Sequence, residues 1–166
     1  MTTQQDVLAV GSSMEVGEGL RGVEDHIAQD WDLWSRSLGN FIMPMLAELA
    51  EEVPQIQAAI FCSADGLNLC TLGVREGDVG RLSALTSSVF TVAAAHRKVV
   101  TPETSDAMTV HISAGDDHTV LYAVELVGVG QFVLGAYAEE IPLGKLLVEI
   151  RRTADRVVER LSISPP

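Results

Sequence analysis

Histidines are the residues of this 166-residue sequence that are best suited to proton transfer or metal binding, and they are scattered along it. A metal or acid–base site needs several such side chains to converge, and no two of them share a recognisable local spacing. We therefore expect surface or boundary positions rather than a metal site. The four residues are His26, His96, His111 and His118.

Three short acidic or hydroxyl groupings have the residue types of a catalytic site. Ser63 lies near Asp65, but no histidine is near them in sequence, and the pair is typical of a turn. The pair at 116–117 follows a glycine and also favours a turn over a metal site. Glu139-Glu140 is typical of a solvated strand end rather than of a catalytic acid and base.

The two cysteines, Cys62 and Cys70, lie on either side of a predicted hairpin turn. A cross-strand disulfide is one interpretation. The interpretation we favour is two buried thiols in a cytosolic protein, where disulfides are rare. Their spacing matches no zinc-binding pattern.

Nucleotide-binding motifs are missing from the sequence. It has no glycine-rich run that ends in Gly-Lys-Ser/Thr, so the chain is not itself a P-loop GTPase. The stretch Gly128-Val129-Gly130-Gln131 lacks the third glycine and the following helix of a dinucleotide site, and it favours a hairpin turn. We predict no catalytic, cofactor-binding or metal-binding residue, and no enzyme activity of the chain's own.

The net charge of −12 argues against partners that carry negative charge. An acidic surface repels phosphate backbones and anionic lipids, so nucleic acid and membrane surfaces are not expected ligands. One local basic cluster occurs near the C-terminus, where cations complement the end of a helix. It consists of Arg151, Arg152, Arg156 and Arg160.

The sequence shows no signal peptide at its N-terminus and no apolar stretch long enough for a membrane span. The longest apolar stretch, at 126–138, is interrupted by Gly128, Gly130 and Gln131. We expect a cytoplasmic location, with recruitment to a membrane only through partners.

The N-terminal part of the chain divides into two segments. Residues 1–22 are polar and aperiodic, which predicts a disordered arm. Residues 23–38 have an apolar residue every three or four positions, which predicts an amphipathic helix. This helix either folds back on its own domain or docks on a partner or a second copy. Its apolar stripe consists of Val23, Ile27, Trp31, Trp34 and Leu38.

Residues 39–162 predict one folded domain, followed by a tail at 163–166. A helix is expected from Phe41 to Val53, where Pro54 ends it. Strands are expected at 56–62 and 67–72 around an Asp-Gly turn, then a helix at 78–99. Three further strands, at 108–113, 119–127 and 131–138, precede a last helix that opens at Pro142.

This element order predicts an α+β fold with a five-stranded antiparallel sheet flanked by helices. The first and last helices of the domain are expected on one face, and the helix at 78–99 on the other. A helix is about 10 Å wide and strands lie about 4.8 Å apart, so one helix leaves part of five strands bare. We predict a twofold homodimer through this helix and the edge strand at 107–113. The predicted dimer or partner surface comprises Leu82, Leu85, Ser88, Val89, Val92, Ala95, His96, Met108, Val110 and Ile112.

The organisation resembles the roadblock / dynein light chain family. The likeness is carried by the first domain helix with Val53-Pro54, the strand Ala58–Phe61 with Asp65-Gly66-Leu67, the small-residue helix Leu82–Ala95, and the last two strands before the Leu-rich helix. It covers about 120 residues, and the arm at 1–40 departs from the minimal family pattern. Composition is similar to that of proteins from a high-GC bacterium such as an actinomycete.

The resemblance implies a dimer with a sheet that continues across the twofold axis. Many family members are regulators or scaffolds of Ras-like small GTPases, and similar bacterial proteins occur in systems with a sensor kinase. It thus implies a cytoplasmic, non-enzymatic regulator. If the chain stimulates GTP hydrolysis, we expect it to reposition the partner's own residues. An arginine finger is the alternative, with Arg81, Arg97 and Lys98 as candidates.

Two other functions stay open at this stage. One is a small-ligand sensor of profilin-like shape, which requires a pocket between sheet and helix with convergent polar groups. The other is a structural polar-scaffold protein, in which the helix with Trp31 and Trp34 makes the adhesive contact.

Overall fold

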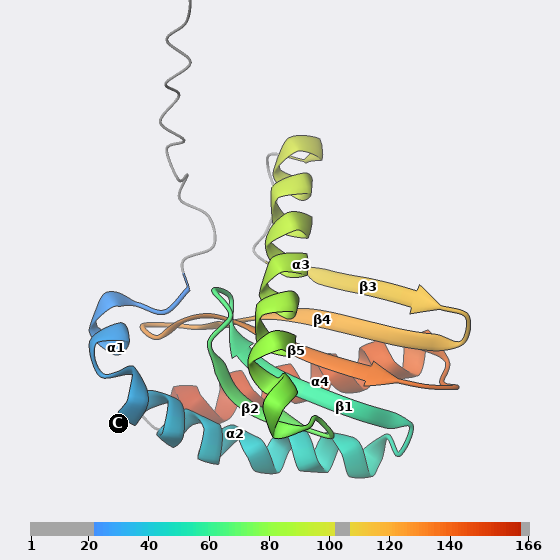
Figure 1. The fold of residues 1–166 in the computed structure, drawn as a ribbon, viewed down its shortest axis with the longest axis horizontal. Coiled ribbons are helices and arrows are strands. Elements are labelled where there is room, and N and C mark those ends of the chain that lie inside the picture. Colours follow the sequence, from blue (N-terminus) through green and yellow to red (C-terminus); the bar gives the residue numbers. More distant parts are fainter. Residues whose placement is uncertain (1–21, 102–106, 164–166) are drawn as a thin grey trace, which may run out of the picture.

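The chain folds into one antiparallel sheet with helices on both faces (Figure 1). This computed structural model describes residues 22–101 and 107–163. The strands are β1 (Ile56–Ser63), β2 (Asn68–Leu72), β3 (Thr109–Ala114), β4 (Asp117–Leu126) and β5 (Gly130–Ala138). The helices are α1 (Asp25–Gln29), α2 (Trp31–Glu52), α3 (Val79–Val100) and α4 (Leu143–Ile163), with a 3₁₀ turn at Glu76–Asp78 before α3.

The strand order is β2-β1-β5-β4-β3, and all neighbours are antiparallel. The two hairpins β1–β2 and β4–β5 and the short β3–β4 turn account for most of this order, because tight turns join adjacent antiparallel strands. The predicted fold class is confirmed. β3 is an edge strand, as the sequence analysis expects.

The main core lies between the sheet and the pair α2 and α4. It is built from apolar residues of both helices, such as Leu46 and Leu146, against aromatic residues of the sheet such as Phe61 and Phe132, whose rings stack with centroids 5.5 Å apart. Arg156 of α4 bonds to Glu48 and Glu52 of α2, at 3.0 and 3.4 Å. These contacts fix the two helices side by side on one face.

The N-terminal helices differ from the sequence expectation of one helix over 23–38 and another from Phe41. The helix is interrupted at Asp30, between α1 and α2, and α2 then continues without a break through residues 38–41. Gly39, between the two expected helices, is buried inside α2. A Cβ atom there would lie 2.5 Å from the backbone oxygen of Leu69 in β2, so the glycine serves close packing of helix on strand.

The predicted disordered arm, apart from Gly22, and the tail beyond Ile163 lie outside the described residues. Within the described ranges, no helix combines the length and the apolar content that a membrane crossing requires.

Candidate interaction surface

Among the described elements, α3 is the one that covers the sheet face opposite to α2 and α4, and Figure 1 shows it running across the strands. Its inner side packs on a small second core of Ile60, Cys62, Leu121 and Val133 through Phe90, which is 1% exposed. The C-terminal turns of α3 project beyond the β3 edge of the sheet (Figure 1).

Small hydroxyl residues, as well as Leu82 and Val89, lie on the inner side of the N-terminal half of α3. The Ser87 hydroxyl donates a 2.6 Å hydrogen bond to the carbonyl oxygen of Ala64 in the β1–β2 turn. Gly66 of that turn has a φ of +94° and lies against Ser87, where an added Cβ would be 3.2 Å from the serine Cβ. The Ser83 hydroxyl bonds within the helix, to the Val79 carbonyl at 3.0 Å. These bonds satisfy the hydroxyls of Ser83 and Ser87, and the small side chains allow a close approach.

The outer side of α3 carries a row of uncovered apolar residues. Leu85, Val92 and Val99 are 53%, 69% and 83% exposed, respectively. They recur every seven residues, which places them on one side of the helix in the manner of a coiled-coil seam. Ser88, Ala95 and His96 lie exposed among them. We call this row the α3 stripe, and its exposure in a single chain predicts a covering partner.

The neighbouring edge strand is also open. Apart from the partly buried Val110, the residues of β3 are exposed, and Ile112 is 47% exposed. β3 pairs only with β4 in the described part of the chain, so its outer edge presents backbone groups that can accept another strand.

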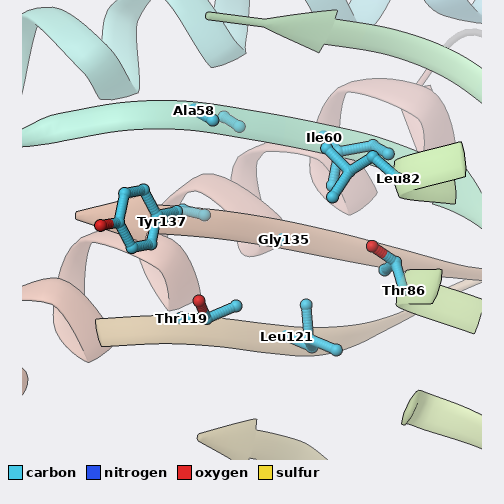
Figure 2. A pocket seen from close by; sticks show the side chains of 10 residues that line it. Ala58, Ile60, Leu82, Thr86, Thr119, Leu121, Gly135 and Tyr137 are labelled. Carbon is cyan, nitrogen blue, oxygen red and sulfur yellow. The ribbon is translucent and has the colours of Figure 1, made fainter. Parts of the chain in front are cut away.

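A hollow of about 320 Å³ lies between the N-terminal half of α3 and the strands β1, β5 and β4. Figure 2 shows its floor at Gly135, with Leu82 and Thr86 of α3 on one side and Tyr137 on another. Gly135 keeps the floor low, because a Cβ there would lie 2.9 Å from Ile60 Cγ2 and 3.1 Å from Leu121 Cδ2. The lining is mostly apolar, as expected for a sheet face that one helix covers incompletely.

The residues of the predicted dimer or partner surface all lie on α3 or on the β3 side of its sheet face, but they have two different environments. Leu82, Val89, Met108 and Val110 are partly buried around the second core. The others are exposed and free to contact another molecule. They are Leu85, Ser88, Val92, Ala95, His96 and Ile112.

The apolar stripe of the N-terminal helices packs on the chain's own core. Ile27 is fully buried, Leu38 is buried, and Trp31 and Trp34 are partly buried against the main core. Val23 forms an isolated β-bridge with Gly130 at the β4–β5 turn. Docking of this stripe on a partner stays a prediction.

The cysteines and the Ser63–Asp65 pair have structural surroundings. Cys62 belongs to the second core and Cys70 to the main core, so they lie on opposite faces of the sheet. Burial, followed by the charge of Asp65, raises the pKa of Cys62 to about 12, and burial raises that of Cys70 to about 12. Ser63 donates to the Asp65 carboxylate and accepts a 2.9 Å bond from the Leu67 amide, which closes the β1–β2 turn.

The basic candidates are only partly available to a partner. Arg97 donates a 2.9 Å hydrogen bond to the Ala107 carbonyl, which lies shortly before β3, whereas Arg81 and Lys98 are exposed on α3.

Beside the hollow, the hydroxyl of Tyr137 donates a 3.0 Å hydrogen bond to Glu139, and this bond raises the pKa of Tyr137.

Two of the four scattered histidines meet in the structure. His111 Nε2 and His118 Nδ1 are 3.1 Å apart on β3 and β4. This pair was not predicted from the sequence, although the hairpin around Gly115 offers a signal for it. The numbers of paired residues across this hairpin add up to 231, so His118 lies diagonally across from His111. Within the described residues, no three or more His, Cys, Asp or Glu side chains gather as a metal site.

Comparison with solved structures identifies the fold. A roadblock domain from Streptomyces avermitilis superposes with a TM-score of 0.56 at 20% identity, over 70% of this chain and 93% of that one. MglB from Myxococcus xanthus gives 0.62 at 15%, over 77% and 93%, and the gliding protein MglB from Thermus thermophilus gives 0.62 at 15%, over 76% and 93%. The chain has the roadblock fold. No family model and no curated protein matches the sequence.

Proposed function

We propose that two copies of this roadblock-fold chain pair through the α3 stripe and the β3 edge. We further propose that the dimer regulates or scaffolds a Ras-like small GTPase in the cytoplasm, without an active site of its own. The observation that carries the proposal is the exposed apolar stripe of α3 near an open edge strand. Figure 1 shows the ribbon of α3 passing close to the start of β3.

Burial of the α3 stripe supplies a large part of the free energy that association needs. Leu85, Val92 and Val99 are each more than half exposed, so a symmetric contact covers six such side chains. At about 1.5 kcal/mol each, this gives roughly 9 kcal/mol. Association costs about 4–15 kcal/mol, so the added backbone pairing of two β3 edges matters for affinity. The same contact places a second α3 near the bare part of the sheet.

The fold supports the GTPase part of the proposal. The chain shares it with two MglB proteins, and the sequence resembles a family in which many members regulate small GTPases. One further MglB structure is described as tetrameric, which is consistent with self-association in proteins of this shape. A sensor kinase or another signalling protein is a further candidate partner.

Binding to a purified Ras-like GTPase from the same organism tests the proposal. The GTPase is loaded with GDP or with a non-hydrolysable GTP analogue, and the affinity of each form is measured by calorimetry. A regulator binds the two forms unequally, whereas equal affinities reduce the function to scaffolding. Absence of binding to either form contradicts the GTPase assignment.

A hydrolysis assay with the same GTPase separates two routes of stimulation. If the chain repositions the partner's own residues, Arg81→Ala and Lys98→Ala leave the stimulated rate within about twofold of the unmodified protein. An arginine finger in trans contributes about 10³-fold or more, so its removal would abolish the stimulation.

A small-ligand sensor is the second candidate, and the hollow beside α3 favours it. Its volume of about 320 Å³ is at the lower end of small-molecule sites, and Thr86, Thr119 and Tyr137 supply polar groups. A thermal shift with a metabolite panel tests this function. A stabilising compound whose effect disappears in Gly135→Val supports it, because the new side chain would fill the floor.

A further inference from the structure

The hollow beside α3 has a mostly apolar lining and an aromatic wall at one end. Ile60 and Leu121 are apolar side chains around its floor at Gly135. Figure 2 shows Tyr137 and Leu82 on opposite sides of Gly135, so the hollow extends from α3 to the tyrosine ring. Its volume of about 320 Å³ suits a small organic molecule, and its lining favours a ligand with an apolar body.

Two carboxylates meet at the hydroxyl of Tyr137. The hydroxyl oxygen lies 3.0 Å from Glu139 Oε1 and 3.5 Å from Asp117 Oδ2. Thr119 and Tyr137 are paired in register and both line the hollow. Side chains alternate between the faces of a strand, so Asp117 and Glu139 lie on that same face, at the rim of the hollow. One hydroxyl proton serves only one of the two carboxylates at a time.

Neither carboxylate has a cationic partner among the described residues. The ion pairs within that part of the chain are made by Arg152 and Arg156, with glutamates of α2 and α4. Like charges that face each other on neighbouring strands repel each other. The net charge of −12 adds to this repulsion, so a cation at this end of the hollow is electrostatically favoured.

We propose that the hollow binds a small organic cation, such as a primary alkyl amine, with its apolar chain over Gly135 and its ammonium group beside Asp117 and Glu139. The site rests on the second candidate function, a small-ligand sensor, and specifies the class of ligand. An ammonium group has three donors, which is enough for both carboxylates. The alkyl chain buries apolar surface that α3 leaves bare. An anion of the same length is repelled by the same two charges.

Hexylammonium chloride, 1-hexanol and sodium hexanoate test the proposal, because they share one alkyl chain and differ in the charge of the head group. Calorimetry measures their binding to the full-length chain at pH 7 and low salt. We expect the amine to bind with a dissociation constant of about 1 mM. The alcohol should bind about tenfold more weakly or worse, and the carboxylate should not bind. Equal affinities of amine and alcohol, or no binding of the amine up to about 20 mM, would overturn the proposal.

Substitutions assign the charge preference to this site. Asp117→Asn combined with Glu139→Gln should remove the preference for amine over alcohol. Gly135→Val should weaken the binding of both, because its side chain fills the floor. Glu125→Gln is the matched control, since Glu125 is another exposed carboxylate of β4. A loss of the same size in this control would indicate a general attraction to an acidic chain and would contradict the proposal. Circular dichroism verifies that each variant folds.

The thermal shift with the metabolite panel separates the ligand class from the sensor function. If a neutral or anionic compound stabilises the chain through the hollow and hexylammonium does not bind, the ligand class is wrong and the sensor function stands. If neither the amine nor any compound of the panel binds, both are contradicted. Binding of the GTPase is measured separately and depends on neither outcome.

Discussion

Single positions decide how closely the helices approach the sheet. Gly39 lets α2 lie against β2, and Gly135 keeps the floor of the hollow low, because a Cβ at either position would meet an atom at 2.5 or 2.9 Å. At Gly39 the opposing atom is a backbone oxygen, which cannot move aside as a side chain can. The contact between α2 and β2 therefore depends on this one residue.

We expect Gly39→Ala to lower the free energy of unfolding by about 1–3 kcal/mol, because the added methyl overpacks the contact with Leu69. Urea denaturation followed by circular dichroism measures the change. Gly144→Ala is the matched control, since this residue is also helical and no atom lies within 4 Å of its added Cβ. It should be neutral or stabilise by up to about 1 kcal/mol. Equal effects of the two substitutions would contradict the close-packing account.

The two thiols should be inert in the folded chain. Burial raises the pKa of Cys62 and of Cys70 to about 12, from 9.0, so neither forms thiolate at pH 8. Titration with a thiol reagent at pH 8 should detect no rapid reaction in buffer and two thiols in 6 M guanidinium. One fast thiol without denaturant would mean that the sheet opens more readily than its packing indicates.

The same pKa shifts predict how the stability of the fold changes at alkaline pH. The unfolded thiols ionise above about pH 9 while the folded ones stay neutral up to about pH 12. The thiol contribution to stability is thus complete below pH 9 and decreases as the pH rises toward 12.

At the scale of elements, α2 and α4 form one layer that Arg156 ties together. Its guanidinium is about a quarter exposed and bonds to Glu48 and Glu52 of the other helix. We expect Arg156→Met to cost about 1 kcal/mol. Arg152→Met is the control, because Arg152 pairs with Glu149 of its own helix and is 58% exposed. Its cost should stay below about 0.5 kcal/mol in thermal unfolding, and a larger cost than for Arg156→Met would contradict the interhelical role.

The α3 stripe gives a prediction about assembly. Val92→Asp places a charge at the centre of the stripe and should dissociate the dimer, with little change in the stability of the single chain, because residue 92 is 69% exposed. Val148→Asp is matched to it, as an exposed helical valine on α4. Sedimentation velocity should give a smaller species for Val92→Asp only. The same species for both variants would place the interface elsewhere.

The sequence predicts the elements well, because the alternation in β3 and the turn glycines at 66, 115 and 128 are local signals. It predicts the inner side of α3 poorly. Ser83, Thr86 and Ser87 are buried there, while Leu85 and Val92 point outward. Hydrogen bonds from the serines to the Val79 and Ala64 carbonyls offset the burial of polar groups, and polarity alone does not reveal such bonds. The prediction of a helix break near residue 39 is wrong for a related reason, since Gly39 lies in a close contact between α2 and β2.

At the scale of the whole molecule, the two faces of the sheet are covered unequally. In the part of the chain that the structure describes, two helices cover one face, whereas α3 alone covers the other and leaves a hollow, an exposed stripe and an open edge. The sequence anticipates this asymmetry from the order of the elements. It does not reveal which residues of α3 remain exposed, because that depends on how the helix rotates about its axis when it docks.

The most direct test is the mass of the full-length chain by multi-angle light scattering at micromolar concentration. The account predicts a species of twice the chain mass of 17.8 kDa, converted to the chain mass by Val92→Asp. A stable species of 17.8 kDa for the unmodified chain would contradict the claim that a second copy covers α3.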